Sequence, residues 1–580
     1  MSAVRSPGSA GNQGRAGDRS GARDQGYVMV VVVVSMTVLI AMLTVVLGYS
    51  RTTIKTVRNA ADWNQALQAA DAGVADYLAR LNADDNYWQG VDCTNVALKG
   101  PTSRTNTCGW NATTPPGWAD LPGSGAQYHY EVDVSSTPSN GTVVLTSSGR
   151  SRGENRTIQV RMRRGGFGEF LYYTVYETVD PENEAVYGYK NTTAISRCTK
   201  YYYQGRDTSY CSDINFVSGD VIDGPLHTND AMLMYGTPRF NGTTTTSWPS
   251  CTKSNPSTCY RRNGSPSPTF AKGIAYRDPV QLPESIGDLR QYVDPTQPNP
   301  GCLYTGPTRI KIVNGSGTTP STMRVWSPWT TSTNSGCGTV PLNGSAAIPI
   351  PHNSLIYVQN VPATQTAPVS GKTNPGTGAC PGGWIGDGFP LAGTTTSGDY
   401  NQTLDEAKCT YGTVYVEGTL KGRLSIAAEA NVVITGDLTY SGGRTGTDAL
   451  GLLANESVKI YHPVRCTSYS SWRKECSSGS NLNRPSGSTF TDPEVNAAIL
   501  TLRHSFTVQQ YQFGSRLGDL SLFGTIAQRF RGPVGTTNTS GYLKKYVYDT
   551  RMRYAPPPYF LDPVRSAWGV KTYGELVPRY

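Results

Sequence analysis

The chain has 580 residues, a formal net charge of +9 at pH 7 and only 16% charged residues. That length exceeds one ordinary domain, so two or more folded units are expected. The positive charges are spread out, with no dense Lys/Arg block in the body, which argues against nucleic-acid binding. The abundance of Tyr (35), Gly (63) and Pro (38) favours a loop-rich, strand-rich extracellular protein over a charged, helical enzyme of the cytosol.

Residues 1–26 form a basic leader, rich in Gly and Ser, that is predicted to be disordered. An uncharged run, YVMVVVVVSMTVLIAMLTVVLGY, follows directly from Tyr27 to Tyr49. A helix of that length crosses a hydrocarbon core of about 30 Å, so residues 27–49 are predicted to contact membrane lipid. An ordinary secretory signal has a shorter apolar core with its cleavage site behind it. Here a cut between Gly26 and Tyr27 would keep the helix on the mature protein.

Helical spacing of apolar residues continues beyond the uncharged run, with Gly73 as the one weak point. A single helix over residues 27–82 is therefore predicted, apolar all round in its first half and amphipathic in its second. The apolar positions of the second half are Ile54, Val57, Ala61, Leu67, Ala70, Val74, Leu78 and Leu81.

This N-terminus resembles that of type IV pilins and pseudopilins, in which a basic leader ending in Gly precedes an aromatic residue, an apolar run and an amphipathic extension. The stretch NQALQAADAGVADYLARLN (Asn64–Asn82) is similar to the corresponding segment of PilX-like minor pilins. The resemblance implies that a prepilin peptidase cuts after Gly26, leaving Tyr27 as the new N-terminus. It also implies that the helices of several subunits pack into a filament core.

Val31 departs from the pattern of major pilins, which carry a Glu at this fifth mature position. A carboxylate inside a bilayer is costly and usually functional, so its absence is informative. It argues against a repeating shaft subunit and leaves a low-copy role at the tip or in initiation open. The alternative is a plain single-pass anchor that joins no filament.

The twelve cysteines all lie on the C-terminal side of the apolar run. Their even number favours six local disulfides in an oxidising compartment, which places the body outside the cell. No CxxC motif occurs and no His lies at ligand spacing from a cysteine pair, so no metal site is predicted. The expected pairs are Cys93 with Cys108, Cys198 with Cys211, Cys251 with Cys259, Cys302 with Cys337, Cys380 with Cys409, and Cys466 with Cys476.

Residues 83–166 show short alternating runs separated by turn sequences. Tyr128, Tyr130 and Val132 alternate with polar residues, and similar runs follow at 143–145 and 158–162. This pattern predicts a small antiparallel β unit close to the stem.

Residues 167–580 contain a recurring phrase, seen in VYVEGTL (Val414–Leu420), VVITGDL (Val432–Leu438) and LSLFGTI (Leu520–Ile526). Successive short strands that turn corners at Gly are typical of a β-solenoid, or parallel β-helix, in which each coil is buried by its neighbours. An antiparallel sandwich or barrel is the alternative. Irregular spacing between the copies predicts disulfide-braced insertions at about 242–270 and 361–408. Phrases such as GPLHTNDAM (Gly224–Met232) also resemble large actinobacterial surface proteins with a pilin-like stem and a β-rich ectodomain.

Signals for chemistry are weak. The carboxylates Asp220, Asp223 and Asp230 are the candidates for glycoside hydrolysis, yet two of them sit in ordinary Gly-Asp or Asp-Gly turns. The acidic stretch ETVDPENE, with Glu177, Asp180, Glu182 and Glu184, favours a solvated turn over a Ca²⁺ site. Each of the five histidines, including His227 and His504, favours a structural role. No catalytic, cofactor-binding or metal-binding residue is predicted.

The sequence thus predicts a non-enzymatic, pilin-like cell-surface protein of minor pilin or pseudopilin type, single-pass in the cell membrane, that acts in assembly or adhesion. Its expected partners are lipid, other pilin-like subunits, and a surface glycan or host surface. The alternative is a membrane-anchored carbohydrate-binding or carbohydrate-active β-helix protein that joins no filament.

Overall fold

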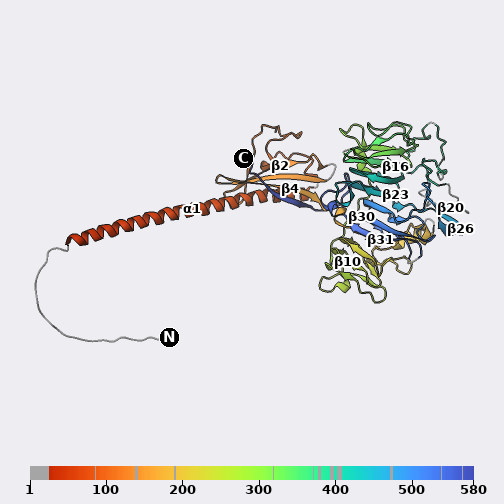
Figure 1. Ribbon diagram of the computed structural model, residues 1–580, viewed down its shortest axis with the longest axis horizontal. Helices are drawn as coiled ribbons and strands as arrows, with labels where there is room; N and C mark the ends of the chain where they lie inside the picture. Colours follow the sequence, from red (N-terminus) through yellow and green to blue (C-terminus); the bar gives the residue numbers. More distant parts are fainter. Residues whose placement is uncertain are drawn as a thin grey trace, which may run out of the picture.

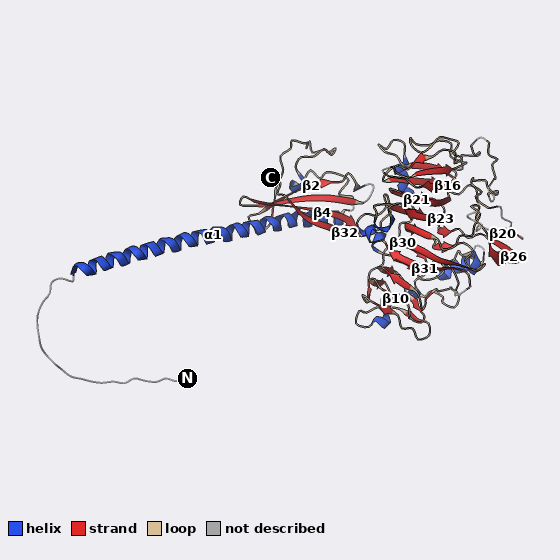
Figure 2. Ribbon diagram, viewed as in Figure 1, coloured by secondary structure: helices blue, strands red, loops and turns tan. Residues whose placement is uncertain are grey.

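A long helix, a small antiparallel sheet and a larger stack of parallel strands follow one another along the molecule (Figures 1 and 2). The computed structural model describes residues 25–580 except 85, 138–140, 189–190, 318, 370, 377–379, 392–397, 401–407, 471–474, 537–538 and 565. Residues 1–24 of the leader therefore lie outside the described residues. The prediction of a mainly β chain with one long N-terminal helix is confirmed.

The helix α1 (Gln25–Ala83) is a single element of 59 residues. Its first half projects away from the rest of the molecule, and its second half lies against the small sheet (Figure 1). The change comes at Asp62, the first buried side chain, after which Ala66, Ala69 and Ala70 are fully buried. The amphipathic half packs because its apolar stripe faces one side only.

The small sheet has five antiparallel strands in the order β1-β2-β3-β4-β32. Helix α1 covers one face, where Val74 and Leu81 meet Leu145, Ile158 and Val160. The alternation seen in the sequence arises because one face of each strand is buried under this helix. The strands are β1 (Ala119–Asp120), β2 (Gln127–Asp133), β3 (Thr142–Ser151), β4 (Glu154–Arg164) and β32 (Trp568–Leu576).

The fifth strand corrects the predicted boundary between the two β regions. The prediction assigned residues 167–580 to the large region, but β32 near the C-terminus pairs with β4 from Trp568↔Arg164 to Leu576↔Thr157. The large body is therefore inserted between two neighbouring strands of the small sheet. No local sequence signal marks this pairing, because the partners are about 400 residues apart.

Three parallel ladders build the body, and the first of them is the longest. Its strands pair in register from one end of the body to the other. In spatial order they are β14 (Ile274–Tyr276), β11 (Thr244–Thr246), β8 (Leu226–Thr228), β5 (Tyr172–Tyr176), β30 (Arg516–Phe530), β28 (Glu494–Thr501), β24 (Ala449–Ala454), β22 (Arg423–Ala428), β19 (Ser354–Gln359) and β15 (Cys302–Thr305).

Several strands bend at a corner and so take part in two ladders, and the first block carries a separate three-stranded parallel sheet as well. Gly418 in β21 marks such a bend: its φ is +121°, and a Cβ there would lie 1.9 Å from the Ile312 carbonyl oxygen. The further parallel strands are β13 (Thr269–Phe270), β10 (Arg239–Phe240), β7 (Val221–Asp223), β31 (Gly541–Tyr548), β23 (Val432–Tyr440), β21 (Val414–Leu420), β16 (Thr308–Val313), β25 (Val458–Ile460), β29 (Phe506–Val508), β6 (Asn215–Phe216), β9 (Leu233–Met234) and β12 (Arg261–Arg262).

Shorter elements lie at the ends and edges of the body. Antiparallel strands β17 and β18 continue from β16, and β20, β26 and β27 form a separate small sheet. Their bounds, with those of the helices, are β17 (Thr322–Trp326), β18 (Ile348–Pro349), β20 (Gly398–Tyr400), β26 (Val464–Ser470), β27 (Glu475–Asn481), α3 (Glu184–Tyr187), α4 (Thr192–Cys198), η1 (Val96–Leu98), η2 (Phe167–Glu169), η3 (Tyr202–Gln204), η4 (Pro256–Thr258), η5 (Gly287–Val293), η6 (Gly443–Thr445) and η7 (Thr550–Arg553).

The chain builds the stack in two blocks. The first block, residues 172–276, runs outward from β5 to β14; residues 277–301 then cross to the far end, and the second block, residues 302–548, returns from β15 to β31. The two blocks join in the middle, where β30 pairs with β5 and β31 with β7, both in parallel. Both connections to the small sheet leave from this joint.

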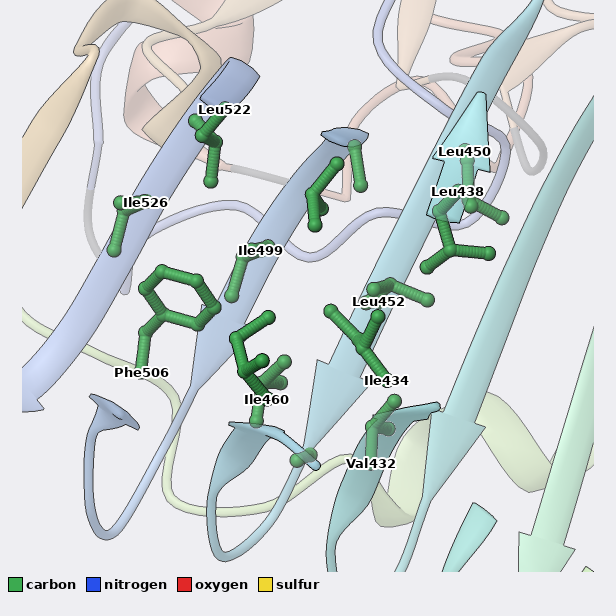
Figure 3. Close-up of a cluster of buried hydrophobic side chains, with 14 of the residues drawn as sticks. Val432, Ile434, Leu438, Leu450, Leu452, Ile460, Ile499, Phe506, Leu522 and Ile526 are labelled. Carbon is green, nitrogen blue, oxygen red and sulfur yellow. The ribbon is translucent and has the colours of Figure 1, made fainter. Parts of the chain in front are cut away.

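The core of the stack consists of inward-facing aliphatic side chains from successive strands (Figure 3). Leu452 lies between Ile426 and Ile499 of the neighbouring strands, and all three are fully buried. Burying one such side chain contributes about 1.5–3 kcal/mol. Because each rung covers the next, stability depends on contacts between neighbouring rungs.

The first ladder is also buried on its outer face. Leu282 and Ile286 of the crossing segment pack there with Met552 and Phe560, over Leu355 and Leu453 of the ladder. Strands covered on both faces show continuous apolar runs, such as ALGLLA in β24, in place of alternation.

One predicted insertion is wrong in its extent, and the other is only partly described. Within 242–270, the segments β11, β12 and β13 pair in the ladders, so they are rungs of the stack. The Thr-rich strand β11 escaped recognition because it has no apolar alternation. Much of 361–408 lies outside the described residues, although Trp384, Ile385 and Phe389 pack against the outer face of the stack.

Candidate assembly helix and its surroundings

The projecting half of α1 is the most unusual surface of the molecule. Every side chain from Tyr27 to Ser50 is exposed, from 43% at Val32 to 77% at Tyr49 among the large apolar ones. By length and composition, α1 alone among the described helices could cross a membrane. An apolar surface of this size needs a cover of lipid or of other helices.

The Ser and Thr hydroxyls described in this half form hydrogen bonds within the helix and so do not need water as a partner. The Ser35 hydroxyl donates to the Val32 carbonyl oxygen at 2.9 Å, that of Thr37 to Val34 at 2.8 Å, and that of Thr44 to Ala41 at 2.8 Å. A hydroxyl that bonds to its own helix loses little on transfer to lipid or to a helix bundle.

The predicted processing site lies at the first turn of this helix. Gly26 is within α1 as its second residue, although its surroundings are not described, and Tyr27 is 74% exposed. Val31 is 49% exposed, and the next charged residues along the helix are the cations Arg51, Lys55 and Arg58. The apolar half thus presents no carboxylate to a neighbouring chain.

Small residues let the second half of α1 lie very close to the sheet. A Cβ on Gly149 of β3 would lie 2.0 Å from the Ala66 carbonyl oxygen and 2.4 Å from the Ala70 nitrogen. A Cβ on Gly73 would lie 2.3 Å from Ser147 Oγ, and the Ser147 hydroxyl donates to the Ala70 carbonyl oxygen at 2.7 Å. Gly73, which weakens the helix by propensity, therefore serves close packing.

The end of α1 is fixed by a cluster of tyrosines and ionic groups. The Tyr130 hydroxyl donates to Asp76 at 2.8 Å, and Arg80 donates to the same carboxylate at 3.0 Å. Burial raises the pKa of Tyr130 far above its usual value, so this hydroxyl stays protonated as a donor. The helix and the sheet are thereby held as one rigid unit.

Ionic contacts also hold the small unit to the body. Arg163 of β4 lies 2.8 Å from Asp562, and Lys571 of β32 lies 2.5 Å from Glu169. The Trp568 backbone N–H donates to the Asn82 side chain of α1 at 2.7 Å. Burial raises the pKa of Asp562 even though Arg163 lowers it. Residues from both connections and from α1 thus meet at one place.

Two residues of the predicted acidic turn hold the two blocks of the body together. Glu177 of the first block pairs with Arg531 at 3.2 Å, and both are almost fully buried. Asp180 lies 2.7 Å from Nδ1 of His504, whose Nε2 lies 2.9 Å from Glu456. Glu182 is exposed, and the side chain of Glu184 lies outside the described residues.

His504 is therefore a charged connector. Burial lowers the pKa of its imidazole, but the carboxylates of Asp180 and Glu456 on either side have the larger combined effect and raise the pKa to about 10. His227, in contrast, is buried without a carboxylate, which lowers its pKa to about 3. His129 and His462 are also buried, whereas His352 is exposed.

The three candidate catalytic carboxylates have separate structural partners. Asp230 pairs with the buried Arg206 and accepts from the Glu177 backbone N–H at 2.9 Å. Asp220 accepts from the backbone N–H of Val217 at 3.0 Å, and Asp223 from the side chain of Asn241 at 3.4 Å. Ion pairing accounts for Asp230, turn capping for Asp220, and a side-chain hydrogen bond between neighbouring rungs for Asp223.

Asp220 also lines a small cavity together with Arg531, Lys544 and Tyr172. Burial lowers the pKa of Lys544 to about 8, and the nearby Arg531 lowers it as well. Within the described part of the chain, no group of three or more His, Cys, Asp or Glu residues is arranged to hold a metal ion.

Five of the six expected disulfides are formed, joining Cys93 to Cys108, Cys198 to Cys211, Cys251 to Cys259, Cys302 to Cys337 and Cys380 to Cys409. Cys466 is also disulfide-bonded, and the side chain of Cys476 lies outside the described residues. The bridges are spread over the small unit, both blocks and the 361–408 region.

No protein-family model matches the chain, and no curated protein does. Among solved structures, the chain is similar to the competence-associated pilin ComZ from Thermus thermophilus. The sequence identity is 13% and the TM-score 0.24, with 90% of this chain and 98% of that chain covered. A TM-score this low adds no argument about this chain.

Proposed function

We propose that this chain is a non-enzymatic, pilin-like surface protein of minor pilin or pseudopilin type. It is cut between Gly26 and Tyr27 and retains α1, with residues 27–49 in the membrane before assembly. The main support is the division of α1 into an exposed apolar half and a half buried against the small sheet. The exposed half is free to pack with other helices while the buried half holds the body at a fixed angle.

The body lies outside the cell in this proposal. Five disulfides spread over the small unit and the body support an oxidising compartment, because such bridges are rare in the cytosol. The exposed cations Lys55 and Arg58 then lie just beyond the apolar run, where they would meet lipid headgroups on the outer side.

We infer that the body is a β-solenoid. The ten strands of the first ladder all pair in parallel, several strands bend to serve two ladders, and the core comes from stacked rungs. At about 4.8 Å per strand, the stack extends about 45 Å.

The shape of the body supports a low-copy position at a filament end. The stack lies across the direction of α1, with β10 and β16 on opposite sides of the attachment (Figure 1). Subunits of a shaft pack side by side through helices only about 10–12 Å wide, so a crosswise body would obstruct close neighbours. Val31 supports the same position, because no carboxylate is available for a neighbouring N-terminus.

Intact-mass analysis of the native protein tests the proposal. The wild-type protein should give a mature species that begins at Tyr27. The Gly26→Leu variant should keep its leader. Gly125→Ala, at an exposed position with open space around it and far from the cut, is the control and should be processed normally. A native protein that retains residues 1–26 would contradict processing and leave the plain single-pass anchor.

A further inference from the structure

The free end of the first block carries an unbalanced positive charge. Strands β12, β13 and β14 form the last rung, and each pairs on one side only within the described chain. The sequence from Ala231 to Arg277, which builds this end, contains no Asp or Glu. Its six cations are Arg239, Lys253, Arg261, Arg262, Lys272 and Arg277.

Within the described part of the chain, four of these cations have no carboxylate partner. Arg239, Lys253, Arg262 and Lys272 are exposed, and none of them forms an ion pair with a described residue. Arg261, in contrast, is paired with Asp213. We name the four unpaired residues the cationic end.

The four side chains lie within two rungs of one another along the stack. Arg239 of β10 is in register with Thr269 of β13, one rung further out. Arg262 belongs to β12, Lys272 lies between β13 and β14, and Lys253 is in the loop closed by Cys251–Cys259 just before β12. Since rungs are about 4.8 Å apart, the four residues lie close together along the stack axis and are distributed around its last two coils.

The surroundings of the cationic end suit sugars. Tyr235 and Tyr276 are 54% and 46% exposed, so each ring offers an apolar face, although the Tyr276 hydroxyl donates to the exposed Asp278 carboxylate at 3.3 Å. Exposed hydroxyl and amide side chains, including Thr252, Asn255 and Asn263, lie in the same segment.

We propose that the cationic end binds an anionic polysaccharide, one that carries carboxylate, sulfate or phosphate groups along its length. This rests on the proposed function, because such a polymer must reach the end from outside the cell. Four separate cations spread around the end of the stack, with exposed tyrosines in the same segment, match a sugar chain with spaced charges. Double-stranded DNA binders make about 6–10 phosphate contacts, which needs a denser cluster.

The test uses the full chain in detergent micelles and measures binding to polygalacturonate, with neutral dextran as the uncharged control. The combined variant R239E/K253E/R262E/K272E should weaken binding at least 10-fold, and the Gln version of the same four at least 3-fold. A matched variant, R161E/R290E/K545E/R553E, changes the same net charge at exposed positions elsewhere and should lose less than 3-fold. Wild-type binding should also weaken as salt rises.

Equal losses in both Glu variants would overturn the site, and absence of polygalacturonate binding would overturn the ligand class. Binding to a DNA duplex with no binding to the polysaccharide would also overturn it. If the Glu and Gln variants bind normally but self-associate, the four residues only protect an open sheet edge. None of these measurements requires cleavage at Gly26, so a failure here leaves the proposed assembly role standing, and the reverse also holds.

Discussion

The small antiparallel unit and the large parallel stack bury their strands in different ways. In the small unit, long neighbouring strands share one apolar face, which a single helix covers. In the stack, short strands are buried mainly by the rungs above and below them. The stability of the small unit depends on the close contact between helix and sheet, and that of the stack on the repeated contacts between neighbouring rungs. Each is closed by a pairing between residues far apart in sequence.

Those two closures lie close together in the molecule. β32 closes the small sheet, and the pairing of β30 with β5 closes the stack, with both chain connections between them. A change in a repeated rung should therefore act locally, while a change at a closure should loosen the link between the stem and the body. Four substitutions test this difference.

Trp568→Ala should have the largest effect. Trp568 is 5% exposed, belongs to the core between α1 and the small sheet, and starts the closing strand. Truncation of a buried Trp typically costs about 3–5 kcal/mol of unfolding free energy. Denaturant unfolding measures the loss. Leu576→Ala, at the exposed end of the same strand, should cost less than about 1 kcal/mol; equal costs would contradict the role of β32 as a closing strand.

Leu452→Ala should cost about 3 kcal/mol, within the range for buried Leu. Leu452 is fully buried between Ile426 and Ile499. Hydrogen exchange should show faster exchange in β22, β24 and β28, with the small sheet unchanged. Leu543→Ala, at a 52% exposed site on β31, is the control. Loosening of α1 by Leu452→Ala would show that the two regions are not independent.

Gly149→Ala should cost about 2–3 kcal/mol, because its methyl group would overlap the backbone of α1. Limited proteolysis should then cut within residues 62–83, which are protected in the wild type. Gly125→Ala adds a methyl group in open space of the same unit and should change neither stability nor cleavage. An unchanged protease pattern in Gly149→Ala would contradict the close helix contact.

His504→Gln should cost about 2 kcal/mol near pH 6 and progressively less at higher pH. The folded pKa, about 10, lies above the usual value of 6.5, so the charged imidazole stabilises the fold fully below pH 6.5. That stabilisation is lost as pH rises towards 10. Unfolding measured between pH 5.5 and 10 checks this slope, with the exposed His352→Gln as control. A cost independent of pH would mean that packing, and not charge, matters there.

The sequence was sufficient where the pattern is local. The uncharged run predicted the exposed half of α1, the apolar phrases around Val414 and Val432 predicted inner positions, and neighbouring cysteines predicted the five described bridges. Gly73 was misleading as a sign of a weak helix. A glycine is needed there because a side chain would collide with Ser147.

The sequence was insufficient where partners are distant or side chains are polar. Nothing near Trp568 indicates pairing with β4, and nothing near Asp180 indicates a bond to His504. The strand β11, whose three residues are all Thr, is a rung without an apolar pattern, because register with its neighbours holds it in place. The cationic end appears only when Arg239 and Lys272 are placed at the same end of the stack.

The most direct test of the account is to locate the chain in sheared surface filaments from the native cell, alongside a strain that lacks the prepilin peptidase. We predict that the chain starting at Tyr27 is present in wild-type filaments at about one copy per filament end, by immunogold labelling of the body. Filament fractions of the peptidase-deficient strain should contain none of the chain. Labelling along the whole shaft, or a chain confined to membranes in both strains, would contradict it.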